Sequence, residues 1–192
     1  METAKSDDSK KVIPAGVKPD TAIFAGGCFW CMEGPFEKLD GVFDAISGYT
    51  GGHKLNPTYG EVGSGTTGHR ESVEIIYDPA KISYEQLLNV FWRQIDPTDD
   101  GGQFVDRGFQ YTSAVFYLNE SQKNAAEKSK DELSKSGKFT SPVVTPILPA
   151  STYYPAEDYH QDFYKKDPEH YHRYRSGSGR DQFIEKTWGS AH

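Results

Sequence analysis

The chain has 192 residues and a net charge of −7, with 21 lysines and arginines against 28 aspartates and glutamates. An acidic chain without a dense basic cluster is not the composition of a nucleic-acid-binding protein. No apolar run reaches the roughly 18 residues that a membrane span needs, and the polar N-terminus lacks the apolar core of a secretory signal. We therefore expect a cytoplasmic protein that binds neither nucleic acid nor membrane, although removal of a leader would leave the same pattern.

The elements can be predicted in chain order from the spacing of apolar residues. Residues 1–20 are polar and aperiodic, as in an N-terminal arm or linker, and residues 21–192 are expected to form a single domain. Apolar alternation or short apolar runs predict strands at 21–25, 42–49, 72–77, 112–118 and 141–148. Helical spacing predicts helices at 29–40, 83–95, about 121–136 and 156–166.

Residues 83–95 give the clearest helix. Ser83 and Gln86 fit a capping box, and an apolar stripe follows at Leu87, Leu88, Phe91 and Ile95. Residues 50–69 and 96–111 are rich in glycine and other turn-forming residues, so both are predicted to be loops.

The order of these elements, β-α-β-β-α-β, indicates the fold class. It predicts an α+β fold with a mixed sheet, a split βαβ (ferredoxin-like) core and helices on one face, as in a two-layer sandwich. The last 25 residues show no clear periodicity. We expect them to form a long irregular C-terminal segment that wraps around the core.

The two cysteines, Cys28 and Cys31, are separated by two residues. A disulfide between them would close so small a loop that it would add little stability, so the pair indicates chemistry. Gly26 and Gly27 let the chain turn from the predicted strand into the predicted helix. Unpaired amides at a helix N-terminus favour an anion, so we expect the pKa of Cys28 to fall from about 8.5 toward 7 or below.

Cys31 is a candidate resolving thiol. Positions three apart on a helix are neighbours, about 5–6 Å apart at Cβ, whereas a disulfide needs about 3.5–4.5 Å. A distortion of the first turn near Gly34-Pro35 would close that gap. The structural alternative is that both cysteines are small buried hydrophobic residues. The six histidines offer no pair with metal-ligand spacing, so we expect no zinc and no other cofactor.

Six segments resemble the peptide methionine sulfoxide reductase A family, in the family's order and over roughly residues 20–189. They are GGCFWC at 26–31, GYTGG at 48–52, NPTY at 56–59, GHRESVEIIYDP at 68–79, DRGFQY at 106–111 and PAEDYHQDF at 155–163. Chance does not produce six separated motifs in one order. The resemblance implies an enzyme that reduces methionine S-sulfoxide, free or in proteins, to methionine and so repairs oxidised proteins.

The resemblance also implies roles for individual residues. Cys28 is the nucleophile, and Glu71 donates a proton to the sulfoxide oxygen. The positions expected around the substrate are Phe29 and Trp30 for its methyl group, Tyr59 and Tyr111 for its oxygen, Asp106 to shape and hydrate the site, and His160 near the rim.

One departure from the family concerns recycling. Many relatives have cysteines in the C-terminal tail, but this tail has none, and Gly63 stands where some relatives have cysteine. Cys31 stands where the family often has glycine. Any resolving thiol within the chain must therefore be Cys31; otherwise a reductant acts directly on oxidised Cys28. A Cys28–Cys31 disulfide would be reduced by an external dithiol such as thioredoxin.

The chemistry explains why an acid is needed. The sulfoxide oxygen is a poor leaving group unless it is protonated, and a free glutamate, with a pKa of about 4.3, has lost its proton at neutral pH. Burial against aromatic residues raises a carboxyl pKa, so we expect Glu71 to be buried and partly protonated. Taken alone, Glu71 would be a solvated strand residue, Tyr59 and Tyr111 packing residues, and Asp106 a surface turn.

Two other functions were weighed. The C-x-x-C pair alone suggests a thioredoxin-like disulfide oxidoreductase, and the aromatic residues suggest a peptide-binding module without catalysis. Neither explains Glu71 or Tyr59. We expect a monomer whose partners are methionine sulfoxide, free or in peptides and proteins, and thioredoxin.

Overall fold

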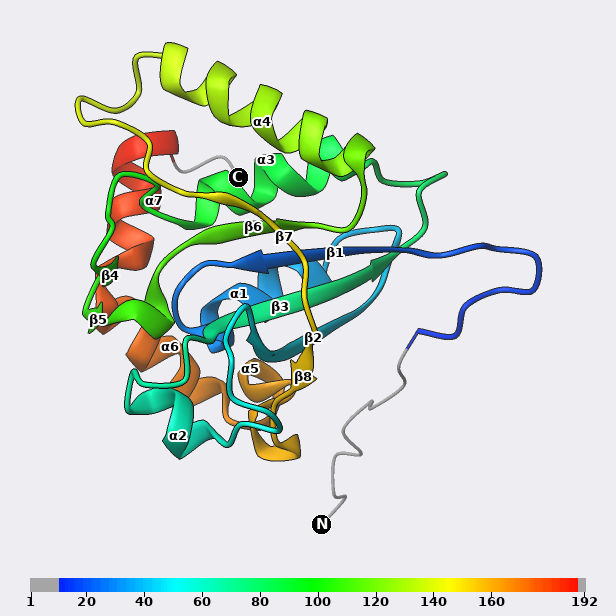
Figure 1. The fold of residues 1–192 in the computed structure, drawn as a ribbon, viewed down its shortest axis with the longest axis horizontal. Helices are drawn as coiled ribbons and strands as arrows, with labels where there is room; N and C mark the ends of the chain where they lie inside the picture. Colours follow the sequence, from blue (N-terminus) through cyan, green and yellow to red (C-terminus); the bar gives the residue numbers. More distant parts are fainter. Residues whose placement is uncertain (1–10, 190–192) are drawn as a thin grey trace.

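The computed structural model describes residues 11–189 and contains a six-stranded mixed sheet in the order β7-β6-β1-β3-β2-β8 (Figure 1). Strands β6 and β7 pair in parallel, and the other neighbours pair antiparallel. The strands of this sheet are β1 (Asp20–Ala25), β2 (Val42–Thr50), β3 (Arg70–Tyr77), β6 (Ala114–Tyr117), β7 (Ile147–Pro149) and β8 (Tyr154–Pro155). The α+β class and the mixed sheet predicted from the sequence are confirmed.

The helices in the described residues are α1 (Phe29–Glu37), α2 (Tyr59–Gly63), α3 (Tyr84–Gln94), α4 (Glu120–Lys135), α5 (Phe163–Lys166), α6 (Pro168–Ser178) and α7 (Arg180–Trp188). Two 3₁₀ turns, η1 (Phe109–Tyr111) and η2 (Asp158–His160), and a small hairpin of β4 (Gly102–Gln103) and β5 (Asp106–Arg107) complete the fold. Strand β3 lies between β1 and β2, and β1 lies between β3 and β6, so two β-α-β units interleave.

The two faces of the sheet are covered differently. Alternation along β1 directs Ala22 and Phe24 into the main core with the helices, and Ile23 and Ala25 into a smaller cluster on the other face. Figure 1 shows the segment from β7 to β8 crossing that second face in an extended form. Tyr153 of this segment donates its hydroxyl to backbone carbonyls of β2 and β3, which fixes it to the sheet.

The main core is centred on Phe24. Its ring stacks on Phe91 of α3, with centroids 4.9 Å apart, and on Phe36 of α1, at 5.6 Å. The predicted capping box of α3 is present, since Ser83 accepts from the amide of Gln86 while the Gln86 side chain accepts from the amide of Ser83. The stripe predicted for this helix is fully buried at Leu87, Leu88, Phe91 and Ile95.

Four segments differ from their predictions. Residues 50–69 are not all loop, because Thr58 caps the short helix α2 by accepting from the amide of Glu61, and residues 96–111 contain the β4–β5 hairpin and η1. The strand predicted at 141–148 is confined to β7, since the backbone of Pro142 and Pro146 cannot donate to a ladder. The helix predicted at 156–166 is split into η2 and α5.

The prediction of an irregular C-terminal segment is wrong, because residues 168–188 form α6 and α7. Asp167 caps α6 by accepting from the amide of His170 at 3.1 Å, and Pro168 stands in its first turn. Gly179, at φ +92°, ends α6 and leads into α7. The two helices contact α1 and α3, so this segment covers the core as a helical pair.

The predicted N-terminal arm lies partly outside the described residues, because residues 1–10 are not among them. Residues 11–19 are largely exposed and contain a turn but no strand or helix, and β1 begins at Asp20. Within residues 11–189, no helix combines the length and apolar character that crossing a membrane requires.

Replacing Phe24 tests the centre of the core. Phe24→Ala should lower the free energy of unfolding by about 3–5 kcal/mol, because it leaves a cavity between Phe36 and Phe91. Urea unfolding followed by circular dichroism measures this loss. Leu118→Ala, at a side chain that is 45% exposed, is the control and should change stability little. An equal effect of the two substitutions would contradict the proposed core.

Candidate active site

The nucleophile candidate stands at the junction of β1 and α1. Gly27 adopts φ +86°, and a Cβ at this position would lie 2.7 Å from Cβ of Gln103, so a larger residue would clash. Cys28 follows as the N-cap residue of α1, and its carbonyl accepts from the amide of Cys31 at 3.1 Å. The glycine turn therefore delivers the sulfur of Cys28 to the first turn of a helix.

The two cysteines are free thiols that are buried together. Cys28 is 7% exposed and Cys31 is 1% exposed, and a hydrogen bond joins their side chains. Burial raises the pKa of Cys28 well above its ordinary value. The pKa of Cys31 is lowered to about 6, first by the hydrogen bond from Cys28 and also by the charges of Arg180 and Arg175, with burial acting in the opposite direction.

The expectation that Cys28 has the lowered pKa is therefore wrong for the reduced protein. Burial favours its neutral thiol, and the nearby acids Glu71 and Asp106 act in the same direction. The hydrogen bond between the two thiols favours the charged form of the Cys31 sulfur. Because Cys28 donates its hydrogen bond to that sulfur, its proton has an acceptor next to it.

Glu71 lies in the second position of β3 and faces the first turn of α1. Its Oε1 accepts a hydrogen bond from the amide of Phe29 at 3.2 Å, so it satisfies one of the unpaired amides of the helix. The side chain is 2% exposed, and burial raises its pKa to about 8, with a further contribution from Asp106. Glu71 is buried, as predicted, and the raised pKa agrees with the expected protonated form.

Two phenols and a carboxylate surround Glu71. Tyr59 begins α2, Tyr111 ends η1, and each is half-buried, with a pKa raised first by burial and then by the charge of Glu71. Within residues 11–189, neither hydroxyl is engaged with a protein group, so both are free to donate to a ligand. Asp106 of β5 accepts from the hydroxyl of Tyr174 on α6.

Aromatic rings complete the site. Nε1 of Trp30 donates to Nδ1 of His160 at 3.0 Å, and the Trp30 ring stacks on Phe163 with centroids 4.0 Å apart. The His160 ring lies 4.3 Å from Tyr59 and 5.0 Å from Phe29. Burial lowers the pKa of His160, and within the described residues its buried Nε2 has no hydrogen-bond partner.

The structure thus brings all the predicted site residues together, and we call them the active-site cluster: Cys28, Phe29, Trp30, Cys31, Tyr59, Glu71, Asp106, Tyr111 and His160. Phe29 is almost fully buried and lies beneath the rings of Tyr59 and His160.

Sequence reasoning missed several residues that hold this cluster. Tyr174, Arg175 and Arg180 come from α6 and α7, the segment predicted to be irregular. Gln161 was also missed; its side-chain amide pairs with the backbone N–H and C=O of Ser47, at 2.9 and 2.8 Å, and so fixes the turn that contains His160. The Asp167-Pro168 start and the Gly179 stop were the signals for these helices.

A group of acids away from the cysteines was considered as a metal site. The carboxylates of Glu33, Glu37 and Asp162 lie within 4.8 Å of one another. Glu33 already accepts from the hydroxyl of Ser47 and the amide of Asp162, each at 2.7 Å, and Lys165 contacts both other acids. These contacts join the three acids and Lys165 in a structural network, in which the buried Oε2 of Glu37 has no hydrogen-bond partner within residues 11–189, and we assign no metal to it.

Comparison with known proteins supports the same chemistry. A family model described as peptide methionine sulfoxide reductase matches residues 20–192. The chain is 56% identical over 175 residues to peptide methionine sulfoxide reductase MsrA of Bacillus licheniformis, covering 91% of this chain and 97% of that protein. It is 58% identical over 173 residues to the protein of the same name from Bacillus subtilis, covering 90% and 98%. Mxr1 from Saccharomyces cerevisiae in its reduced form matches with a TM-score of 0.74 at 29% identity, covering 82% and 93%.

The raised pKa of Glu71 predicts a pH dependence of stability. A carboxyl whose pKa rises from 4.5 to about 8 on folding stabilises the folded state at low pH, and this contribution is lost as pH rises through 8. Glu71→Gln removes the titration, while its amide oxygen can still accept from Phe29. Urea unfolding at a series of pH values should therefore show a flatter dependence in the variant. The exposed Glu132→Gln is the control, and a native slope in Glu71→Gln would contradict the buried acid.

Proposed function

This chain belongs to the peptide methionine sulfoxide reductase family, and we propose that its active-site cluster reduces methionine S-sulfoxide to methionine by direct attack of Cys28. The observation that carries this proposal is the buried carboxyl of Glu71 beside Cys28, whose pKa burial raises to about 8. It supplies at neutral pH the acid that a sulfoxide oxygen needs in order to leave its sulfur.

In the first step, the sulfur of Cys28 attacks the sulfoxide sulfur. Its proton passes to Cys31, which accepts the hydrogen bond, while Glu71 protonates the sulfoxide oxygen. The S–O bond to substrate breaks as the oxygen is transferred to Cys28. In sum, one thiol and one sulfoxide give one sulfenic acid and one thioether, so Cys28 is oxidised and methionine is reduced.

The rest of the active-site cluster recognises the substrate. The hydroxyls of Tyr59 and Tyr111 donate to the sulfoxide oxygen without the desolvation cost of a cation. Trp30, with Phe29 beneath the neighbouring rings, contacts the methyl group, since sulfur and methyl pack favourably on aromatic faces. Asp106 shapes and hydrates the site, and neutral His160 holds the indole of Trp30 in place.

In the second step, Cys31 gives up the proton that it accepted, which goes to the departing oxygen, and its sulfur attacks the sulfur of oxidised Cys28. The S–O bond breaks, and the oxygen takes up this proton and leaves as water, so the product is a Cys28–Cys31 disulfide. An external dithiol such as thioredoxin then reduces the disulfide by exchange. Because the sequence has two cysteines, no other thiol of the chain can serve.

We further propose that the enzyme acts as a monomer on free and protein-bound methionine sulfoxide in the repair of oxidised proteins. The proposed reaction uses the residues of the active-site cluster and needs none from a second copy of the chain. The reaction consumes only thiols and protons, so the proposed cycle requires no metal, flavin or nucleotide.

Replacing each cysteine separates the two steps. Cys31→Ser should release about one methionine per chain from methionine S-sulfoxide and then stop with thioredoxin, because no disulfide can form. Cys28→Ser should release none. The measurement is methionine formation together with NADPH oxidation coupled through thioredoxin reductase. Repeated turnover of Cys31→Ser with thioredoxin would contradict the resolving role. A native chain that reduced other disulfides but no sulfoxide would favour the thioredoxin-like alternative.

Replacing Glu71 tests the acid. Glu71→Ala should lower kcat/KM by roughly 10²–10⁴-fold, as for loss of a general acid. Glu71→Gln should retain part of the activity, since an amide still donates a hydrogen bond. The native rate should fall as pH rises through about 8, and that fall should be absent in Glu71→Gln. Glu74→Gln on the same strand is the matched control, and full activity of Glu71→Ala would remove the acid from the mechanism.

A further inference from the structure

Tyr159 is an exposed aromatic residue that stands next to the active-site cluster. It lies in η2, directly before His160, and its side chain is 60% exposed. Its ring packs on the ring of His160, with centroids 4.0 Å apart. The His160 ring also lies 4.3 Å from the ring of Tyr59. A short series of ring contacts therefore joins Tyr159 to a residue that the proposed mechanism places on the sulfoxide oxygen.

The position of Tyr159 is held by hydrogen bonds, although most of its surface is exposed. Its hydroxyl donates to Oε2 of Glu157 at 3.3 Å, and Oε1 of the same carboxylate accepts from the hydroxyl of Tyr49 at 3.2 Å. Tyr49 is fully buried on β2. The turn itself is held by Gln161, whose side chain pairs with the backbone of Ser47. A ring that is already held in place loses little conformational freedom when a ligand packs on it.

The exposed part of Tyr159 favours one kind of contact. Its hydroxyl proton is already donated to Glu157, and part of its ring packs on His160. What remains for a ligand is chiefly an apolar ring surface. Aromatic and other large apolar side chains pack favourably on such a surface.

Other exposed apolar side chains stand on the segments that lead to the site. Leu55 is 71% exposed and lies four residues before Tyr59, and Phe109 is 46% exposed and lies two residues before Tyr111. A group of exposed apolar residues at a site is a mark of binding, whereas single scattered ones are not. When methionine sulfoxide is held at Cys28 within a peptide, its neighbours must lie close to the site, because consecutive Cα atoms are about 3.8 Å apart.

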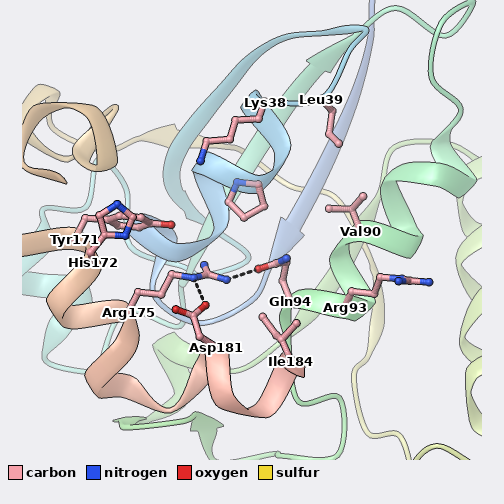
Figure 2. Close-up of a pocket in the computed structure, with 11 residues that line it drawn as sticks. Lys38, Leu39, Val90, Arg93, Gln94, Tyr171, His172, Arg175, Asp181 and Ile184 are labelled. Carbon is pink, nitrogen blue, oxygen red and sulfur yellow. Dashed lines mark hydrogen bonds and ion pairs between the residues drawn. The ribbon is translucent and has the colours of Figure 1, made fainter. Parts of the chain in front are cut away.

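A separate groove of about 690 Å³ lies between α1, α3, α6 and α7 (Figure 2). Among the described residues that line it, none belongs to the active-site cluster. It meets α1 at the backbone, where Nη1 of Arg175 donates to the carbonyl of Cys31 at 2.9 Å. The same guanidinium contacts the side chain of Gln94 and pairs with Asp181. This groove therefore does not continue the substrate site, whereas the ring contacts of η2 do.

We propose that the exposed ring of Tyr159 is a binding subsite for a large apolar side chain within two residues of methionine sulfoxide in a peptide substrate. This inference deepens the proposed function and rests on it, because it concerns a peptide bound at the same site. Tyr159 exchanges no proton and contacts none of the reacting atoms. Its effect is on specificity: oxidised methionines with apolar neighbours in the sequence are bound more tightly than those with small polar neighbours.

The test uses capped five-residue peptides with methionine S-sulfoxide at the centre and dithiothreitol as the reductant. The reference peptide has serine at every flanking position, and each of the others has phenylalanine at one of these positions. For the native chain, kcat/KM should be roughly two- to tenfold higher for at least one phenylalanine peptide than for the serine peptide, through a lower KM. A peptide with lysine at the preferred position should show no such gain.

Two variants test whether the ring of Tyr159 causes this preference. Tyr159→Ala should lower the ratio of kcat/KM for the phenylalanine peptide over the serine peptide to about one, whereas Tyr159→Phe keeps the ring and should keep most of the preference. Because the ratio compares two substrates of one variant, a general loss of active enzyme cancels. Leu118→Ala, at an exposed side chain that follows β6, is the control and should keep the native ratio.

The outcomes separate the two proposals. If the native chain shows no preference, or if the preference survives in folded Tyr159→Ala, the subsite is overturned while turnover of free methionine S-sulfoxide still supports the proposed function. A gain for the lysine peptide that depends on Tyr159 overturns the apolar assignment. Calorimetry with Cys28→Ser protein, which has no nucleophile, measures peptide affinity without turnover. If that affinity depends on Tyr159 but the native chain reduces no sulfoxide, the proposed function fails and the binding subsite stands.

Discussion

The hydrogen bond from the Phe29 amide to Glu71 is the contact on which the site depends. It joins the first turn of α1 to β3 and so places a carboxyl beside the sulfur of Cys28. The burial that surrounds this contact keeps the proton on Glu71 and also favours the neutral thiol of Cys28. The hydrogen bond from Cys28 lowers the pKa of Cys31, and the charges of Arg180 and Arg175 act in the same direction. Glu71 and the two cysteines therefore meet at the first turn of α1.

The C-terminal helices α6 and α7 hold the first turn of α1 and its neighbours in place. Tyr174 binds Asp106, Arg175 binds the carbonyl of Cys31, and Arg180 lies against the Gly27 turn. The η2 turn is fixed in the same manner, because Gln161 pairs with the backbone of Ser47 and His160 binds the indole of Trp30. The first turn of α1 and the glycine turn before it are therefore held by contacts with η2, α6 and α7, which are far from them in sequence.

Local signals predicted most of the sheet and the site. The alternation in β3, the capping box of α3 and the glycine turn before Cys28 depend on neighbours within a few residues, so sequence alone displays them. Glu71 and the two tyrosines were found through the resemblance, because nothing in their local sequence distinguishes them from packing residues. The extended segment before β8 and the helices α6 and α7 were misjudged. Their structure depends on contacts with distant elements, and α6 has a weak apolar stripe beneath many charged residues.

The charge distribution between the cysteines also escaped sequence reasoning. A helix N-terminus predicts that Cys28 is the more acidic thiol, but its burial and the buried arginines reverse the order. Arg180 looks like a surface residue in the sequence, since it follows the segment SGSG. Its burial becomes visible only when α7 is packed against α3.

The spacing of the two sulfurs has a mechanical consequence. Because Cys28 and Cys31 share one helical turn, the proposed redox cycle closes by a local rearrangement of bonds and requires no mobile segment to deliver a second sulfur. The C-terminal helices α6 and α7 supply no thiol to the proposed cycle, so they can keep one fixed position against the core. A substitution that stabilises the packing of α6 and α7 should therefore not slow the regeneration of Cys28.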